Sequence, residues 1–313
     1  MSKRRDITRA SVPRVRLAMI ALAMACGRGD APAAAGPAAQ TPTAATPTVT
    51  PTPRAQLAAD TTTPSGAMGA SVRRGRALLA HTRDSLPSRV GSSLRCFSCH
   101  LDEGRRASGL PLLGSYTRYP QFRPRRARVD LIEDRVNDCF LRSLNGRALS
   151  PDGTDMRDIV TYLAWLSRGV AVGDSTMQQS VPALATLTAD TSRGAQTYVE
   201  SCARCHGASG QGAGIVPPLW GPKSYNVGAG MARYRTTALF VLHNMPFDRP
   251  NTLTPQQALD VSRYINTRPR PDFAGKENDW PTGERPSDVP YPTRAGSRSG
   301  TDTARTSAHN GAR

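Results

Sequence analysis

Two short cysteine and histidine motifs carry the strongest chemical signal in this chain. Each has the pattern CxxCH, once at residues 96–100 and once at residues 202–206. In such a motif two thiols form thioether bonds to the vinyl groups of a haem, and the imidazole ligates the iron. Two copies in similar surroundings predict two covalently bound haem c groups. The residues that attach them are Cys96, Cys99, His100, Cys202, Cys205 and His206.

A different sulfur residue follows each motif at the same offset. Cys139 and Met245 each lie 39 residues after the motif histidine. We interpret them as the second axial iron ligands, which predicts His100/Cys139 ligation for the first haem and His206/Met245 ligation for the second. Two other readings of Cys139 stay open, because a lone cysteine can be a small buried apolar residue or a reactive thiol without a haem contact.

Other residues are weaker candidates for these ligand positions. Met231 is the alternative to Met245 as the methionine ligand of the second haem. His243 is better interpreted as a structural or surface residue. His81 is a less favoured second ligand for the first haem. Met156 falls inside an amphipathic helix, which makes it a poor ligand.

The N-terminal segment predicts export. Basic residues within 1–16 precede an apolar run over 17–25, as in a secretory signal that is too short to span a membrane. Cys26 follows a small-x-small sequence and resembles a bacterial lipoprotein box, although Ala23 and Met24 depart from its usual residues. We therefore expect a periplasmic protein, released by cleavage at 25/26 or held by a lipid anchor on Cys26. A bridge between Cys26 and Cys139 is a poor alternative.

Composition divides the rest of the chain. Residues 26–69 form an Ala/Pro/Thr-rich stretch that cannot bury a core, and residues 288–313 are similar, so both are expected to be disordered. Two domains are expected between them, at 70–172 and 187–287, with a linker at 173–186.

The net charge of +17 does not indicate a nucleic-acid partner. Export argues against one, and the chain lacks recognition motifs. The basic excess is mostly arginine, and many arginines surround Cys139, where they could form a solvated face or an anion site. They are Arg118, Arg123, Arg125, Arg126, Arg128, Arg135, Arg142 and Arg147.

The two halves repeat the same helical pattern. A helix near residues 74–79 or 193–199 runs toward each motif, and an amphipathic helix over 156–166 or 254–265 closes each half. In the second closing helix, Thr254 is the expected N-cap and Pro255 the first helical residue. The pattern predicts an all-α fold of two tandem domains, each holding one haem.

Both halves resemble class I cytochromes c. A repeated Pro-Leu-x-Gly sequence begins 11 residues after His100 and 12 after His206. In that class such a proline offers its carbonyl to the ring nitrogen of the proximal histidine and fixes its orientation. The resemblance therefore implies this role for Pro111 and Pro218.

Unlike axial ligands would give the two haems different properties. A thiolate lowers the reduction potential and a thioether raises it, so electrons would pass from the first haem to the second. A thiolate is also a nucleophile toward sulfur. Both properties favour sulfur-anion redox chemistry at Cys139.

Several longer stretches resemble the diheme thiosulfate dehydrogenases. They are residues 134–146, 162–167, 217–226, 228–231 and 244–247. The resemblance implies oxidation of two thiosulfates to tetrathionate, or the reverse, with electrons leaving to a soluble or membrane-bound cytochrome or another acceptor. It also implies that Cys139 is the active-site sulfur, that it carries a thiosulfate adduct, and that Arg125 and Arg135 bind substrate.

One position departs from part of that family, and two other functions stay open. Some members have a lysine before the haem-two methionine that competes for the iron, whereas this chain has Asn244. Plain His206/Met245 ligation is therefore expected in both redox states. The alternatives are a non-catalytic diheme electron carrier, which leaves Cys139 and its arginines unexplained, and the diheme subunit of a Sox complex.

Overall fold

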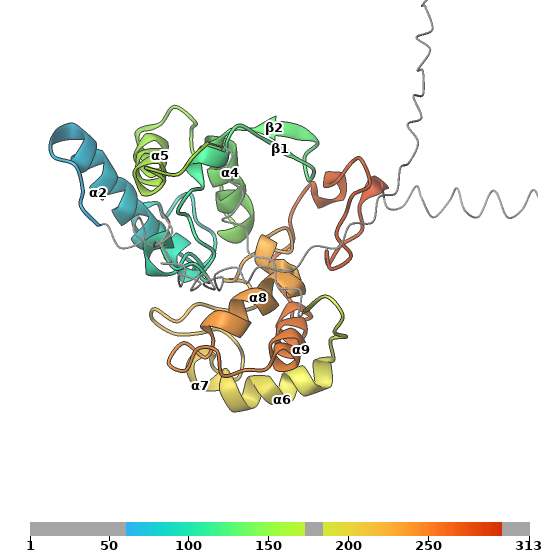
Figure 1. Ribbon diagram of the computed structural model, residues 1–313. Helices are drawn as coiled ribbons and strands as arrows, with labels where there is room; N and C mark the ends of the chain where they lie inside the picture. The colour runs from blue at the N-terminus through green and yellow to red at the C-terminus, as the bar shows by residue number, and fades with distance from the viewer. Residues whose placement is uncertain (1–60, 173–183, 296–313) are drawn as a thin grey trace, which may run out of the picture. The chain divides into compact units, whose positions relative to one another are not determined.

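The computed structural model describes residues 61–172 and 184–295, and both haem motifs lie within them. The described chain is mainly helical, with one small hairpin (Figure 1). The longer helices are α2 (Gly66–Ala80), α4 (Ile132–Asp138), α5 (Thr154–Leu166), α6 (Thr191–Ser201), α8 (Tyr234–Asn244) and α9 (Pro255–Asn266). The shorter elements are α3 (Thr82–Ser85), η1 (Cys96–Ser98), η2 (Asp102–Gly104), η3 (Tyr116–Arg118), β1 (Gln121–Arg123), β2 (Arg128–Asp130), η4 (Cys139–Ser143), α7 (Ala203–His206), η6 (Gly230–Ala232) and η7 (Lys276–Asn278).

The first domain is built on a close crossing of α2 and α5. Gly75 makes this possible, because a Cβ there would lie 2.0 Å from the Asp158 carbonyl oxygen. The Asp158 carboxylate accepts hydrogen bonds from Arg74 Nε at 2.8 Å and Ser71 Oγ at 2.5 Å. The crossing therefore combines backbone contact with an ion pair, and it fixes the helix that precedes the first CxxCH motif.

The second domain repeats this crossing with α6 and α9. A Cβ on Gly194 would lie 2.1 Å from the Asp260 carbonyl oxygen, and Arg193 Nε donates to Asp260 at 2.7 Å. Thr254 caps α9 by accepting from the Gln257 amide, and Pro255 is its first residue, as expected. The predicted all-α fold of two tandem domains is confirmed.

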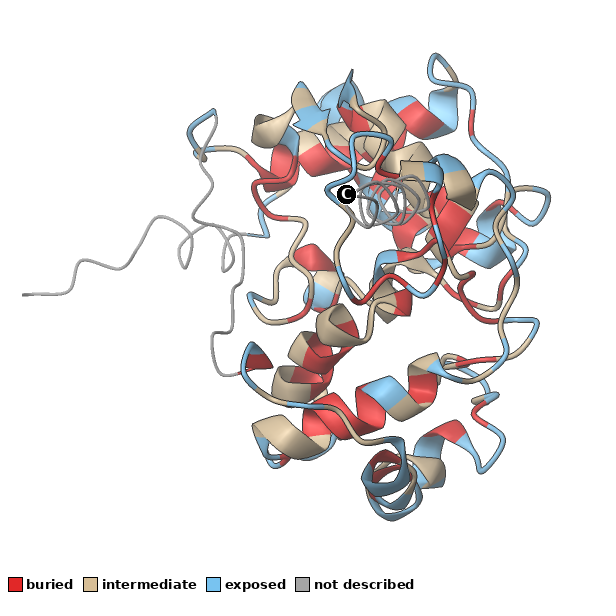
Figure 2. Ribbon diagram, turned by 90° about the vertical axis from the view of Figure 1, so that its right-hand side faces the viewer, coloured by how far each residue is buried: buried red, intermediate tan, exposed pale blue. Residues whose placement is uncertain are grey.

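Each domain has its own hydrophobic core, and Figure 2 shows the buried residues along the inner faces of the helices. The first core contains Leu79, Phe140 and Tyr162, and the second contains Tyr198 and Val261. The first core also takes residues from the second half of the chain, namely Tyr225, Ala229 and Ala232. The chain after the second CxxCH motif thus helps to enclose the first domain.

Two expected boundaries are wrong. Helix α2 begins at Gly66, so the first domain starts before residue 70. The C-terminal segment is ordered beyond residue 287, because Val289 and Tyr291 are 6% and 5% exposed and pack with Trp280. An ion pair between the half-buried Arg233 and the buried Asp288, at 2.8 Å, holds the same segment. Composition predicted disorder here because the segment contains few apolar residues.

A small hairpin leads into the segment that carries Cys139. Strands β1 and β2 pair antiparallel, with Phe122 opposite Val129. This hairpin was not expected from the sequence. It ends at Asp130, directly before α4, and a π-helical turn over Cys139–Ser143 continues that helix. Turns of this type are frequent at functional sites, because they redirect side chains within a helix.

Some expectations fall where the structure gives no description. The signal peptide, Cys26, most of the tether and linker, and the chain after residue 295 lie outside the described residues. Among the residues that are described, no helix is long and apolar enough to cross a membrane.

Candidate functional site

The first CxxCH motif lies in a short turn that follows α3. Thr82 is fully buried, and its hydroxyl accepts a hydrogen bond from the Cys96 amide at 3.1 Å. His100 Nδ1 donates to the carbonyl oxygen of Leu110. This bond fixes the imidazole and leaves Nε2 with its lone pair, as an iron ligand requires.

The second motif begins directly after α6 and contains the whole of α7. His206 is buried, and its Nδ1 donates to the carbonyl oxygen of Pro217 at 3.0 Å. The sequence predicted that the carbonyls of Pro111 and Pro218 accept these bonds, and this prediction is wrong. In both domains the accepting carbonyl belongs to the preceding residue, Leu110 or Pro217. The carbonyl that faces the ring belongs to the peptide bond entering the proline, and not to the one leaving it.

A cavity of about 450 Å³ brings the predicted residues of the first domain together. Cys96, Cys99, His100 and Cys139 all line it, within a mainly apolar wall. Burial lowers the pKa of His100 to about 4, so its ring stays neutral. Burial likewise raises the pKa values of the Cys96 and Cys99 thiols to about 12.

This donor set fits a covalently bound haem. Two thiols and a neutral, oriented imidazole face the cavity, and Cys139 also lines it. Two buried polar atoms of the cavity lining make no hydrogen bond, namely Ser115 Oγ and Arg118 Nε. Burying the Nε of the Arg118 guanidinium in an apolar wall is costly unless an anionic group meets it. A haem carboxylate or a substrate oxyanion would satisfy it.

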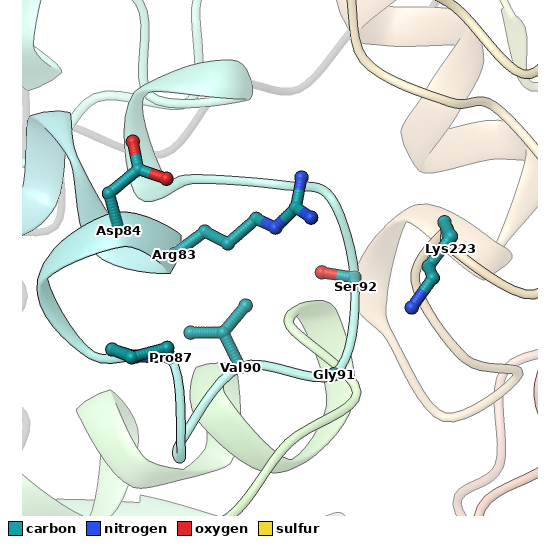
Figure 3. Close-up of a pocket in the computed structure, with 7 residues that line it drawn as sticks. All are labelled: Arg83, Asp84, Pro87, Val90, Gly91, Ser92 and Lys223. Atoms are coloured by element: carbon teal, nitrogen blue, oxygen red, sulfur yellow. The ribbon is translucent and has the colours of Figure 1, made fainter.

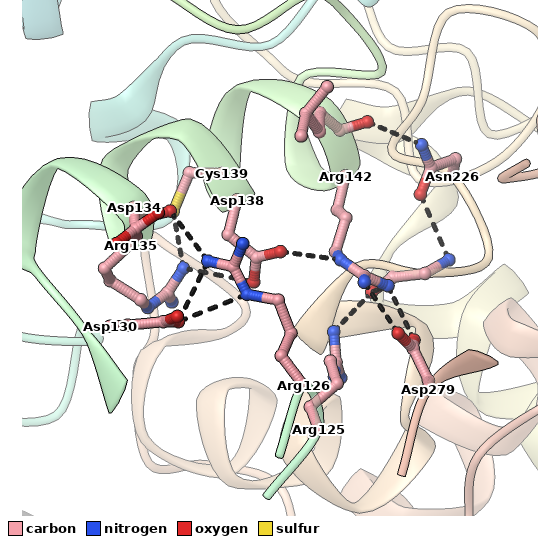
Figure 4. A network of polar contacts seen from close by, with 12 residues as sticks. Arg125, Arg126, Asp130, Asp134, Arg135, Asp138, Cys139, Arg142, Asn226 and Asp279 are labelled. Carbon is pink, nitrogen blue, oxygen red and sulfur yellow. Dashed lines mark hydrogen bonds and ion pairs between the residues drawn. The ribbon is translucent and has the colours of Figure 1, made fainter. Parts of the chain in front are cut away.

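Cys139 is directly paired with one of the predicted arginines. It begins the π-helical turn, and Arg135 lies four residues earlier in α4. Arg135 Nη1 donates to Cys139 Sγ at 2.9 Å (Figure 4). The negative charge available at Cys139 is the main reason why the pKa of Arg135 is raised. Arg135 is thus a permanent cation beside the sulfur.

Arg125, the other predicted arginine, lies in a different place from the one expected. The residues lining the cavity do not include it. Its guanidinium stacks over Trp280 at 4.6 Å and donates to the Gly228 carbonyl at 2.8 Å. Burial and then repulsion from Arg142 lower its pKa. Arg125 therefore contributes charge from behind the site, and the sequence could not show this because Trp280 is distant in the chain.

Sequence reasoning missed several residues of the cavity. Arg118, Arg95, Tyr119 and Ser143 line it together with Arg135. The only sequence signal for Arg118 was its place in the arginine-rich segment. Ser143 follows Cys139 by four residues, which places it near the same helical face.

Met245 and Met231 lie in different hydrophobic clusters. Met245 follows α8 and packs in the second core with Cys202. Met231 packs against the first core and lines the Cys139 cavity. This separation favours Met245 over Met231 as the methionine for the second haem. Met156 is fully buried inside α5.

Asn244 and the two candidate histidines have other roles. Asn244 is fully buried, and its Nδ2 donates to the carbonyls of Ser108 at 2.7 Å and Phe240 at 2.9 Å. It therefore joins the two domains. His81 is exposed at the end of α2, and His243 pairs with Asn251 at 3.3 Å.

A second pocket, of about 490 Å³, lies over residues 83–92 and contains none of the predicted site residues. Figure 3 shows Arg83 stretched along it, with Lys223 on the side of the second domain. Its lining has no sulfur or imidazole group, so it is no haem site.

Known families match both domains. Residues 89–172 match the family described as SoxA/TsdA, cytochrome c domain. Residues 189–265 match the family described as cytochrome C oxidase, cbb3-type, subunit III. Both halves are therefore cytochrome c domains, which implies haem c binding.

Individual relatives cover most of the chain. It is 39% identical over 244 residues to the thiosulfate dehydrogenase of Psychrobacter arcticus, which covers 76% of this chain and 75% of that protein. It is 40% identical over 235 residues to the thiosulfate dehydrogenase of Allochromatium vinosum, which covers 71% and 87%. The solved structure of thiosulfate dehydrogenase (TsdBA) from Marichromatium purpuratum in its as-isolated form matches with a TM-score of 0.64 and 36% identity.

That solved structure is a longer protein. The match covers 73% of this chain and 52% of that chain, so this chain spans about half of its length. The two curated relatives are matched over three quarters or more of theirs. With this identity and both cytochrome c domains in place, the chain belongs to the thiosulfate dehydrogenase family.

Proposed function

We propose that this protein oxidises two thiosulfate ions to one tetrathionate at Cys139 and passes the two electrons to an external acceptor. One observation carries the proposal. The Cys139 sulfur lines the same cavity as the first haem-attachment motif and accepts a hydrogen bond from Arg135. A sulfur, a cation and a haem site in one cavity are what oxidation of a sulfur anion needs.

The proposed ligands are unlike in the two domains. His100 and Cys139 would hold the first iron, and His206 and Met245 the second. When bound, each haem would supply a one-electron acceptor, whose potential a thiolate ligand would lower and a thioether ligand would raise. The separate packing of Met231 and Met245 supports the second pair.

The proposed chemistry conserves sulfur and charge. The Cys139 thiolate bonds to the sulfane sulfur of one thiosulfate, and two electrons leave as the S–S bond forms. A second thiosulfate attacks that sulfane sulfur, which releases tetrathionate and returns the thiolate. The same steps in reverse would reduce tetrathionate.

The arginines make this encounter electrostatically possible. Two dianions must approach one sulfur, and their repulsion needs preorganised positive charge. Arg135 supplies it at the sulfur, and Arg118 and Arg95 supply it along the cavity wall. Arg125 adds charge behind the wall, where it stacks on Trp280.

Export and electron exit belong to the same proposal. The N-terminal sequence supports a periplasmic protein, with release or lipid anchoring at Cys26. Met245 and the second motif would form the exit side toward a soluble or membrane-bound cytochrome or another acceptor.

Product stoichiometry tests the function. Purified holoprotein is mixed with thiosulfate and ferricyanide, and we expect two ferricyanides reduced for each tetrathionate formed. A preparation that carries both haems and is reduced by dithionite, yet forms no tetrathionate, would instead be an electron carrier.

A further inference from the structure

A continuous line of polar contacts runs from the Cys139 sulfur into the fold. Arg135 Nη1 lies 2.9 Å from Cys139 Sγ and 4.0 Å from Asp138 Oδ2. Asp138 Oδ1 accepts a hydrogen bond from Arg142 Nε at 2.7 Å. Figure 4 shows Asp138 between the two arginines. The orientation of Arg135 thus depends on a carboxylate that Arg142 shares.

The line continues into the segment that follows α9. Arg142 donates from Nη1 and Nη2 to the Asp279 carboxylate at 2.7 and 2.8 Å. The two side chains are 6% and 5% exposed. Tyr291 donates its hydroxyl proton to Asp279 at 2.6 Å. This is a buried two-point ion pair, and removal of one partner would leave the other charge uncompensated.

The same segment also holds Arg125. The Trp280 amide donates to the Arg125 carbonyl at 2.8 Å, and the Trp280 ring lies under the Arg125 guanidinium. Arg125 Nη1 and Arg142 Nη1 both donate to the Gly228 carbonyl, at 2.8 and 3.4 Å. Residues from the second half of the chain therefore contact both the half-buried Arg125 and the buried Arg142.

The charges explain why Asp279 matters to Arg135. Arg125, Arg135 and Arg142 share only two carboxylates in this cluster, those of Asp138 and Asp279. Because Asp279 satisfies Arg142, the Asp138 carboxylate stays available to Arg135.

We propose that Asp279 is a positioning residue for the sulfur-anion site. It fixes Arg142, which fixes Asp138, and together they keep the Arg135 guanidinium directed at the Cys139 sulfur and at incoming thiosulfate. The chain that follows α9 thereby completes the active site of the first domain. This inference rests on the proposed function.

The test is the variant Asp279→Asn, which keeps the shape and removes the charge. We expect the KM for thiosulfate to rise about tenfold, because Arg142, which already donates to Asp138, then has no second charged partner and draws Asp138 away from Arg135. Visible spectra should show both haems attached and the second haem unchanged. The matched control is Asp260→Asn, since Asp260 is 1% exposed and pairs with Arg193 at 2.7 Å, apart from the Cys139 network. It should lower the thermal midpoint and leave KM unchanged.

A double variant separates positioning from a general structural effect. If Asp279 acts through Arg135, adding Asp279→Asn to Arg135→Gln should raise KM no further. Equal KM values for Asp279→Asn and Asp260→Asn, or effects that multiply in the double variant, would overturn the inference.

A smaller change provides a test if the Asp279→Asn variant does not fold. Tyr291→Phe removes one hydrogen bond to Asp279 and should raise KM in the same direction by a smaller factor. A wild-type KM in this variant would also count against the inference. If the wild-type holoprotein itself forms no tetrathionate, then the proposed function fails rather than this positioning role.

Discussion

At the scale of single residues, the two domains differ in the sulfur residue that follows each motif. Cys139 lies in a cavity with Arg135 beside it, whereas Met245 lies in an apolar cluster with no arginine bonded to it among the described contacts. The first arrangement suits a charged sulfur that reacts with anions. The second suits an uncharged ligand that only exchanges electrons.

Loss of the Arg135 charge should weaken thiosulfate turnover. We expect Arg135→Gln to lower kcat/KM about 10²-fold, because it removes a preorganised cation at the reacting sulfur. Steady-state rates with ferricyanide would measure this. Arg147→Gln is the control, since Arg147 is exposed in the same arginine-rich segment. Similar rates for both variants would contradict the role of Arg135.

Met245 should be the methionine that binds the second iron. We expect the oxidised protein to show a methionine-to-iron charge-transfer band, which Met245→Leu abolishes. Met231→Leu should keep the band, because Met231 lines the cavity of the other domain. Absorption spectra of the oxidised variants give the answer, and a band lost only in Met231→Leu would reverse the assignment.

The single-residue predictions that rest on sequence spacing depend least on tertiary contacts. The CxxCH motifs place thiols and imidazole together whatever the surrounding fold. The expected carbonyls at Pro111 and Pro218 were one residue late, because spacing does not tell which peptide plane faces a ring. Arg118 could not be separated from its arginine neighbours, since burial depends on contacts distant in sequence.

At the scale of elements, the same helix crossing occurs twice. In each domain a glycine on the first helix meets the carbonyl of a buried aspartate on the last, and an arginine beside the glycine pairs with that aspartate. Helical periodicity predicted the closing helices, because each must bury one apolar stripe. The hairpin and the π-helical turn before and at Cys139 depend on tertiary packing and had no periodic signal.

Filling the glycine contact should destabilise the second domain. Gly194→Ala would place a methyl group against the Asp260 carbonyl and force α6 away from α9. We expect a loss of about 1–3 kcal/mol in the free energy of unfolding, as in other overpacked cores. Denaturant unfolding of the holoprotein measures it. Val199→Ala is the control on the same helix, because Val199 is 71% exposed, and an equal loss there would refute the explanation.

The aspartates of the crossings should make stability depend on acid pH. For Asp158, burial favours the neutral form, but hydrogen bonds from Arg74 and Ser71 outweigh it and lower the pKa. A lowered pKa means that the stabilisation is present above the ordinary carboxyl pKa of about 4 and is lost as pH falls through the folded value. The difference in unfolding free energy between wild type and Asp158→Asn should therefore shrink below about pH 4. A difference that grows on acidification would contradict this.

At the scale of the whole described chain, the second half contributes to the first site. Tyr225 and Met231 line the Cys139 cavity, and Asp279 and Trp280 hold the arginines behind it. The sequence predicted two domains but not this dependence, because motif spacing reports on each domain separately. The same reason explains the wrong boundary at residue 288, where a few buried contacts order a polar segment.

The domains also meet through residues that relate to electron transfer. Asn244 precedes Met245 and bonds to Ser108 of the first domain at 2.7 Å. In the proposed direction, electrons would flow from the Cys139 side to the Met245 side, and this hydrogen bond joins the two domains next to Met245. Substrate chemistry would then take place in the first domain, and electrons would leave the protein from the second.

The central claim is that Cys139 is the site of sulfur chemistry, and tetrathionate formation by Cys139→Ala tests it most directly. Haem content is checked first, because both haems should stay covalently attached through Cys96, Cys99, Cys202 and Cys205. The account predicts that this variant is still reduced by dithionite but forms no tetrathionate from thiosulfate and ferricyanide. Tetrathionate formation at the wild-type rate would contradict it.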